Sequence, residues 1–153
     1  MNKAILNALG TIVFAQFLKI PIKKLTKGEW DWGMFLETGG MPSSHSAGVS
    51  SLATYIALKR GVRTIDFALA AIFGLLVMYD AQGVRRQAGE LTIKLNNLEE
   101  QIERLRGEED HHYHDRKSER LKERLGHQPI EVVGGAILGI ITGFLGKYLH
   151  DWL

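Results

Sequence analysis

The sequence contains no cysteine among its 153 residues. This absence excludes a disulfide-stabilised scaffold, a zinc site built on thiolates and a cysteine nucleophile. An excess of charge is also lacking, because 19 lysines and arginines stand against 17 aspartates and glutamates, for a formal net charge of +2. The basic residues lie mainly between apolar runs rather than along one stripe, so we expect no nucleic-acid partner.

The mean hydropathy of the chain, −0.06, is typical of a soluble protein but averages two unlike parts. Residues 65–79 carry a single charge, whereas residues 99–124 are rich in Glu, Arg, Lys, His and Asp. A membrane protein with a charged excursion gives the same average as a soluble domain, so each segment has to be interpreted separately.

Four apolar segments, approximately 4–22, 46–58, 65–84 and 130–149, predict an all-α fold, an integral membrane helical bundle of about four transmembrane helices. The first segment ends near Pro21, and we interpret it as a retained helix rather than a signal peptide. The second is too short to cross the bilayer unless its polar beginning is also helical and shielded by its neighbours. A soluble bundle is the alternative, which the small amount of polar sequence disfavours.

Four glycines in the last segment, at positions 135, 139, 143 and 146, are separated by steps of four, four and three. They therefore lie on one face of the predicted helix. Such a face lets another helix approach closely, and in lipid this packing replaces the hydrophobic driving force.

A charged excursion separates the third and fourth apolar segments. Its leucines and isoleucine alternate steps of four and three, as in a heptad seam, at positions 91, 95, 98, 102 and 105. We therefore expect a single membrane domain over residues 1–153, with an extramembrane helical hairpin inserted at residues 87–126. Arms that pack on each other and a dimeric coiled coil are equally compatible with so few heptads.

Three histidines, His111, His112 and His114, lie near carboxylates at the predicted hairpin tip. Imidazole and carboxylate groups suit a transition metal by ligand type. A solvated loop is the favoured interpretation, because no framework fixes the ligand geometry there. We expect no metal site in this protein.

The stretch GGMPSSHSAGVSS, residues 39–51, has the composition of a helix start. Ser43 or Ser44 can cap free backbone N–H groups, and the helix end then suits an anion such as phosphate. In the first turn, His45 is placed to donate a proton to an oxygen that leaves the phosphate. A capped helix with an incidental histidine is the alternative interpretation.

Further polar groups flank the apolar segments on the same side of a four-span topology. Lys19 lies near the end of the first segment, Arg85 and Arg86 end the third, and His127 precedes the fourth. Ionisable groups that converge beside lipid indicate a functional site. The spacing of His127 and Glu131 suits a carboxylate that holds the imidazole tautomer while its other nitrogen attacks. Interfacial snorkelling accounts for the cations alone.

Three blocks, MPSSHSA, YDAQGVRRQAGE and LGHQPIEVVGGAILG, closely resemble the divergent branch of the type 2 phosphatidic acid phosphatase and vanadium haloperoxidase superfamily. The likeness covers nearly the whole chain, including FAQFLKIPI near its start. It implies a membrane lipid phosphatase that cleaves a phosphomonoester or pyrophosphate through a phosphohistidine. Phosphatidic acid, phosphatidylglycerol phosphate and polyprenyl diphosphate are the candidate substrates.

The resemblance also implies a role for each matched residue. His45 follows PSS in place of the superfamily's PSG and would be the general acid, while His127 would be the nucleophile and Glu131 would replace the usual aspartate. The phosphate would be held by Lys19, Ser43, Ser44, Arg85 and Arg86. The sequence departs from the superfamily pattern, because no Arg-Pro follows Lys19 and the third motif is split between its arginine and His127.

The resemblance implies no cofactor, and bound vanadate would act as a phosphate analogue. The usual core of about six helices is larger than this chain, so we expect a homodimer. Lysines and arginines are concentrated in the loops 21–44 and 85–128, which predicts a multi-pass protein of the cell membrane with the site at the cytoplasmic face.

Two alternative functions remain open at the level of sequence. The first is a catalytically silent membrane protein that binds or carries an anionic phospholipid with the same fold. The second is a scaffold whose charged hairpin binds a soluble partner.

Overall fold

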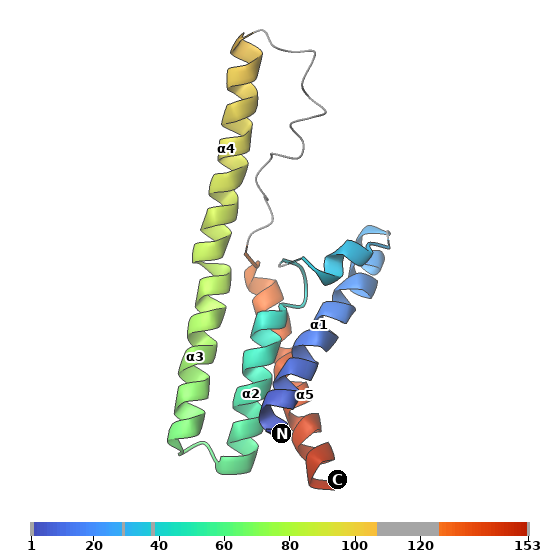
Figure 1. The fold of residues 1–153 in the computed structure, drawn as a ribbon, viewed down its shortest axis with the longest axis vertical. Coiled ribbons are helices and arrows are strands. Elements are labelled where there is room, and N and C mark those ends of the chain that lie inside the picture. Colours follow the sequence, from blue (N-terminus) through green and yellow to red (C-terminus); the bar gives the residue numbers. More distant parts are fainter. Residues whose placement is uncertain (1, 29, 38, 107–125, 153) are drawn as a thin grey trace.

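The computed structural model describes residues 2–28, 30–37, 39–106 and 126–152. These residues form helices and no strand, which confirms the all-α prediction. The elements are α1 (Lys3–Lys27), the 3-10 helix η1 (Trp32–Phe35), α2 (Ser44–Arg60), α3 (Ile65–Gln82), α4 (Val84–Arg106) and α5 (Pro129–Trp152), as shown in Figure 1.

The bundle consists of α1, α2, α3 and α5, which run alternately up and down. Both chain termini lie at one end of the bundle, and the segments that precede α2 and α5 lie at the other (Figure 1). The central helix is α2, which packs against α1, α3 and α5, whereas α1 and α3 do not contact each other within the described residues. The prediction that the segments before α2 and α5 lie on the same side of the bundle is therefore confirmed.

Three stretches are long and apolar enough to cross a membrane: Lys3–Thr26, Ile65–Ile102 and Pro129–Trp152. The remaining bundle helix, α2, has 17 residues, which corresponds to about 26 Å at 1.5 Å per residue. Its polar beginning is helical from Ser44 onward, as a span of this length requires, and its three neighbours shield it.

Side-chain burial in the bundle is inverted relative to a soluble protein. Small and polar side chains fill the interior, among them Ala15, Ala47 and Ser46, whereas large apolar side chains such as Phe144 and Leu75 are more than half exposed. A water-soluble chain cannot expose so much contiguous apolar surface without associating. The arrangement is that of a bundle surrounded by lipid.

Tryptophans mark both ends of this apolar surface. Trp30 and Trp32 stack with ring centroids 6.2 Å apart, and the Lys24 ammonium lies 4.2 Å from the Trp30 ring centroid. Trp152, near the C-terminus, is 82% exposed. Such aromatic groups are typical of the two membrane–water interfaces.

The glycine face of α5 packs against α2. A Cβ at Gly135 would overlap the carbonyl oxygen of Ser43, and one at Gly139 would overlap that of Ala47. Gly143 faces Thr54 of α2, and Gly146 faces a side chain of α1. The face predicted to allow close helix packing therefore does so within the chain, which removes one reason for expecting a homodimer.

A hydrogen-bonded network of hydroxyl and amide side chains joins α1, α2 and α5 in the bundle interior. Asn7 Nδ2 donates to Ser51 Oγ over 2.8 Å, and Thr11 Oγ1 lies 3.0 Å from the same hydroxyl. Thr11 Oγ1 also donates to Thr142 Oγ1 over 2.9 Å. In lipid these bonds satisfy polar groups that would otherwise be unpaired, so they help to fix the three helices against one another.

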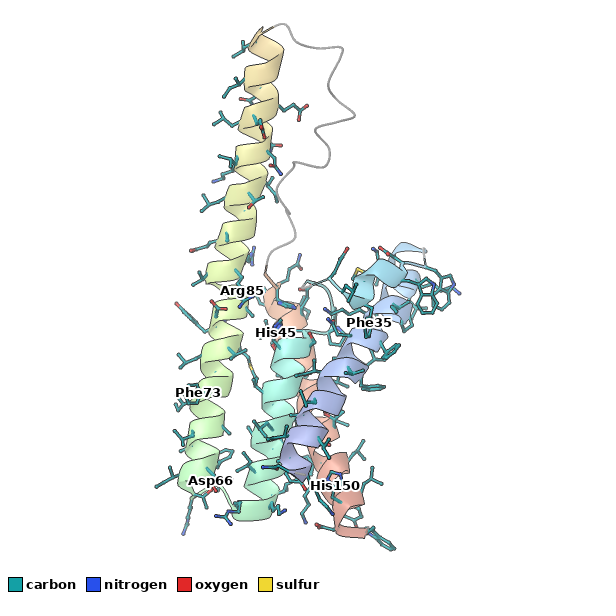
Figure 2. All side chains as sticks on the ribbon, viewed as in Figure 1. Phe35, His45, Asp66, Phe73, Arg85 and His150 are labelled. Atoms are coloured by element: carbon teal, nitrogen blue, oxygen red, sulfur yellow. The ribbon has the colours of Figure 1, made fainter. Side chains whose placement is uncertain are left out.

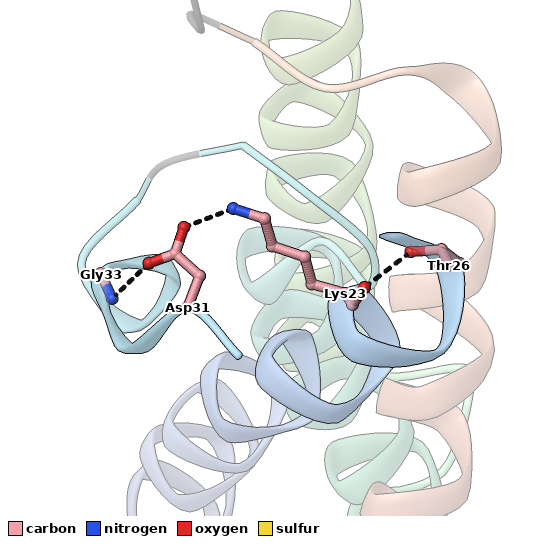
Figure 3. Close-up of polar contacts among 4 residues, drawn as sticks. All are labelled: Lys23, Thr26, Asp31 and Gly33. Atoms are coloured by element: carbon pink, nitrogen blue, oxygen red, sulfur yellow. Dashed lines mark hydrogen bonds and ion pairs between the residues drawn. The ribbon is translucent and has the colours of Figure 1, made fainter. Parts of the chain in front are cut away.

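The first helix continues beyond its expected end. It passes Pro21 and ends at Gly28, whose φ of 77° places it in the left-handed region and whose N–H donates to the Lys24 carbonyl. The expected end near Pro21 was wrong. A proline removes only one hydrogen-bond donor, and the helix continues past it, whereas Gly28 in the left-handed conformation ends the helix. Beyond this end, Figure 3 shows Asp31 between the Lys23 ammonium and the N–H of Gly33, which secures the turn into η1.

The first arm of the charged insertion is α4, which continues the direction of α3 beyond the bundle (Figure 1). Its seam residues Leu91, Leu95 and Leu98 are more than half exposed. The second arm and the three histidines of the predicted tip fall in residues 107–125, outside the described residues. Among the residues that are described, no group of three metal-ligating side chains occurs.

Candidate functional site

The beginning of α2 is fixed by Ser43. Its hydroxyl oxygen accepts hydrogen bonds from the Ser46 N–H over 3.3 Å and from the Ser46 hydroxyl over 3.1 Å. Its own N–H donates to the carbonyl of Glu131 over 3.0 Å, which ties the starts of α2 and α5 together. Of the two predicted caps, Ser43 is therefore the cap, and Ser44 is the buried first residue of the helix.

The backbone of His127 is held by the end of α3. Gly83 interrupts the helix between α3 and α4, so the Ala81 carbonyl is available to a partner outside the helix. The His127 N–H donates to this carbonyl over 2.9 Å. The preceding residue, Gly126, has a φ of 90°, and a Cβ there would overlap the backbone nitrogen of Arg86. Glycine thus lets the chain return closely along the α3–α4 junction.

The two histidines predicted to act together lie side by side. The ring centroids of His45 and His127 are 5.8 Å apart, and the rings meet edge to face at 78°. His127 is 3% exposed, whereas His45 is accessible at the first turn of α2. Figure 2 shows His45 and Arg85 at the same end of the bundle, away from Asp66 and His150.

The environment of His127 disfavours its charged form. Burial lowers the pKa of His127 to about 4, and the positive charges of Lys19, His45 and Arg85 act in the same direction. Both ring nitrogens are buried, and neither has a hydrogen-bond partner among the described residues. The imidazole is therefore neutral at physiological pH and carries a lone pair that no described group of the protein occupies.

Lys19 reaches into the same region from α1. The side chain is 1% exposed, and its ammonium donates to the Glu37 carbonyl over 3.1 Å. Its charge also interacts with the carboxylates of Glu131 and Glu37. A buried ammonium needs such compensation, so the loop that precedes α2 and the start of α5 together hold this cation in place.

The two predicted arginines form different ion pairs. Arg85 Nε donates to Asp80 over 2.7 Å, and its charge acts on both histidines. Arg86 Nε instead donates to Glu90 over 3.1 Å, and Arg86 lines a neighbouring cavity. No role was predicted for Asp80, although it belongs to the YDAQGVRRQAGE block that contains both arginines.

This cavity has a volume of about 520 Å³, within the range of about 300–1,000 Å³ for ligand pockets. It lies between α1, the loop before α2, α4 and the start of α5. Four predicted site residues line it: Lys19, Arg86, His127 and Glu131. Lys23 adds a further cation, whereas His45, Ser43, Ser44 and Arg85 do not line it. His127 therefore lies between the cavity and His45.

Glu131 does not make the predicted hydrogen bond to His127. Its Oε2 accepts the N–H of Gln128 over 3.0 Å, and the Glu131 N–H donates to the Gln128 carbonyl over 2.9 Å. This is one half of a capping box, in which an acidic residue in the first turn satisfies a free backbone donor. The sequence spacing is compatible with a bond from Glu131 to His127 and with a cap at the helix start. In the structure the Glu131 carboxylate accepts the otherwise unpaired Gln128 N–H.

Comparison with known proteins gives two matches. The family model described as "Divergent PAP2 family" matches residues 1–142. A protein of Bacillus subtilis (strain 168) named "Uncharacterized membrane protein YuiD" is 43% identical over 150 residues, which cover 96% of this chain and 95% of the relative. No solved structure matches.

Proposed function

Because the chain belongs to the divergent PAP2 family, we propose that it is a membrane lipid phosphatase. The substrate would be a phosphomonoester or pyrophosphate of a lipid, such as phosphatidic acid, phosphatidylglycerol phosphate or a polyprenyl diphosphate. The inverted burial of the bundle and the membrane-protein relative support a lipid-embedded location.

The observation that carries the proposal is the state of His127. A buried polar atom without a partner costs about 1–3 kcal/mol, so native proteins rarely retain one without a reason. Here two such atoms belong to one neutral imidazole, next to a second histidine and within the field of two cations. A neutral, unpartnered imidazole beside positive charge suits a nucleophile that attacks a phosphate.

The proposed reaction has two steps. In the first, a ring nitrogen of His127 attacks phosphorus, the new P–N bond forms and the ester P–O bond breaks. His45 enters this step as its imidazolium and gives its proton to the leaving oxygen of the lipid, which leaves it neutral. In the second step, His45 takes a proton from water, whose oxygen attacks phosphorus as the P–N bond breaks. Inorganic phosphate is released and both histidines return to their starting states.

The cations and the start of α2 would stabilise the phosphate during this transfer. Lys19 lies on the cavity side of His127, and Arg85 acts on both rings. The first N–H groups of α2, at Ser44 and His45, have no acceptor within the helix. Positive charge and backbone donors at this place favour the additional negative charge of the transition state. Glu131 would be a positioning residue, because it fixes the start of α5 directly after His127.

The excess of lysine and arginine at this end of the bundle supports a site at the cytoplasmic face of the cell membrane. Both termini would then lie on the other side of the membrane. A homodimer also remains part of the proposal, since α3 exposes apolar side chains such as Ile72 and Leu76 that a second copy could cover. Neither feature is needed for the chemistry at His127.

Phosphate release from purified protein in detergent tests the proposal. The panel contains phosphatidic acid, phosphatidylglycerol phosphate and a polyprenyl diphosphate, each with and without vanadate. We expect vanadate-sensitive release from at least one lipid and its loss in His127→Ala and His45→Ala. A folded wild-type protein that releases phosphate from none of them would overturn the proposal.

A second candidate function is a silent protein that binds an anionic phospholipid. It is favoured by the capping role of Glu131 and by the ion pairs that occupy Arg85 and Arg86. A silent binder retains its lipid affinity in His127→Ala and hydrolyses none of the panel, whereas a phosphatase loses turnover in that variant.

A further inference from the structure

A second cavity, of about 600 Å³, lies at the end of the bundle opposite the histidines. It runs over the outer face of α2, which forms its floor, and α1 and α3 form its walls. The walls stay apart because α1 and α3 each pack on α2 without contacting each other within the described residues. The result is a groove that is open sideways, on a part of the bundle where the surroundings are lipid.

The groove is apolar along its length and basic at one end. The apolar part includes Ile5 of α1, Leu52 and Ile56 of α2, and Leu69 and Ala70 of α3. The other end is lined by two cations, Lys59 and Arg60 at the last turn of α2, and by one carboxylate, Asp66.

The cations at this end are incompletely neutralised. Arg60 Nε donates to Asp66 over 3.3 Å, and both of these side chains are more than half exposed. The Lys59 ammonium lies 5.9 Å from the Tyr55 ring centroid and has no carboxylate partner in the described part of the chain. One positive charge therefore remains at the mouth of an apolar groove, at the depth where α2 ends and the headgroup region begins.

We propose that this groove binds one anionic phospholipid, with an acyl chain between α1 and α3 and the headgroup phosphate on Lys59. The volume of about 600 Å³ falls within the range of about 300–1,000 Å³ for ligand sites. The charge at its end matches a negatively charged headgroup, and the apolar walls match an acyl chain. The groove shares no residue with the cavity beside His127, so this inference does not depend on the proposed phosphatase activity.

Native mass spectrometry of the detergent-solubilised full chain tests the headgroup. The probes are phosphatidylglycerol and phosphatidylcholine with identical acyl chains, and neither is a phosphomonoester that the proposed activity would consume. We expect one phosphatidylglycerol to bind about fivefold more tightly than phosphatidylcholine, and Lys59→Gln to remove this preference. Arg63→Gln is the matched control, because Arg63 is an exposed cation of the turn directly after α2 that does not line the groove.

A second pair of variants tests the acyl-chain site. Ala70 lines the groove, so Ala70→Phe fills it and is expected to weaken binding of both lipids at least fivefold. Ala68→Phe adds the same ring to an exposed position of α3 outside the groove and is expected to leave binding unchanged. Lys59-dependent binding that persists in His127→Ala separates this groove from the histidine site.

Three results would overturn the inference. The first is equal binding of the two lipids by the wild-type chain, and the second is an unchanged preference in Lys59→Gln. The third is a dimer in the wild-type spectrum that Ala70→Phe converts to monomer without change in lipid binding, since the groove would then be occupied by a second copy of the chain.

Discussion

His45 and His127 meet edge to face with ring centroids 5.8 Å apart, although one lies in the first turn of α2 and the other just before α5. The pairing depends on the contact between α2 and α5. The Ser43 N–H donates to the Glu131 carbonyl, and Gly135 lies directly against the Ser43 carbonyl. The packing of α2 against α5 therefore also sets the relative position of the two histidines.

Replacement of Gly139 by leucine should destabilise the bundle. A Cβ at this position overlaps the Ala47 carbonyl, so α5 must move away from α2, at a cost of about 1–3 kcal/mol or more. The midpoint of thermal unfolding in detergent measures the effect. Gly10→Leu is the control, because a Cβ at Gly10 meets nothing within 4 Å. Equal midpoints for the two variants would contradict close packing through Gly139.

Thr11→Val should weaken the contact between α1, α2 and α5. The substitution keeps the shape of the side chain but removes the hydroxyl shared with Ser51 and Thr142, at a cost of about 0.6–1.7 kcal/mol. Unfolding in a series of denaturing detergent mixtures measures this loss. Thr26→Val removes an exposed hydroxyl that bonds only within its own helix, and its stability should match that of the wild type.

The stability of the protein should fall on acidification in a way that depends on His127. Its pKa is about 4 in the folded chain and near 6.5 when unfolded, so below pH 6.5 the unfolded state binds more protons than the native state. The stability associated with the neutral ring is complete above pH 6.5 and is lost as the pH falls toward 4. Thermal unfolding midpoints from pH 7 to pH 4 should decrease more steeply in the wild type than in His127→Gln, and parallel curves would contradict this environment.

Glu131 variants distinguish capping from direct action on His127. Glutamine can still accept the Gln128 N–H but removes the negative charge that compensates the buried Lys19 ammonium. Glu131→Gln should therefore lose less stability than Glu131→Ala, which also loses the cap at a further cost of about 0.5–2 kcal/mol. For turnover, we expect Glu131→Gln to reduce phosphate release less than tenfold, far less than His127→Ala. If the two variants are equally inactive, the carboxylate must act on the imidazole during the reaction.

The sequence allowed the convergence of His45, Lys19 and His127 to be predicted. An even number of alternating helices returns the chain to the same side, so these residues lie at one end of the bundle, and the packing of α2 against α5 then brings the two histidines together. The glycine positions of α5 were also informative, since the spacing alone defines one face. The spacing does not identify the partner of that face, and the chain uses it for α2 and α1.

Features that depend on single hydrogen bonds were not predictable. Thr11 is an isolated polar residue in an apolar run and Ser51 is one of several serines near the start of α2, and only the crossing of α1 and α2 brings these two together. The position of His127 depends on the Ala81 carbonyl, which is free because the helix is interrupted at Gly83. A carboxylate near both His127 and a free N–H has two candidate partners, and sequence spacing cannot choose between them.

Detection of a phosphohistidine tests the central claim most directly. The wild-type chain, His127→Ala and His45→Ala are incubated with phosphatidic acid, phosphatidylglycerol phosphate or a polyprenyl diphosphate carrying a radiolabelled terminal phosphate, and then quenched in base. The account predicts a base-stable, acid-labile label on the wild-type protein that maps to His127 and is absent from His127→Ala. Phosphate release by a wild-type protein that never acquires this label, or a label that persists in His127→Ala, would contradict it.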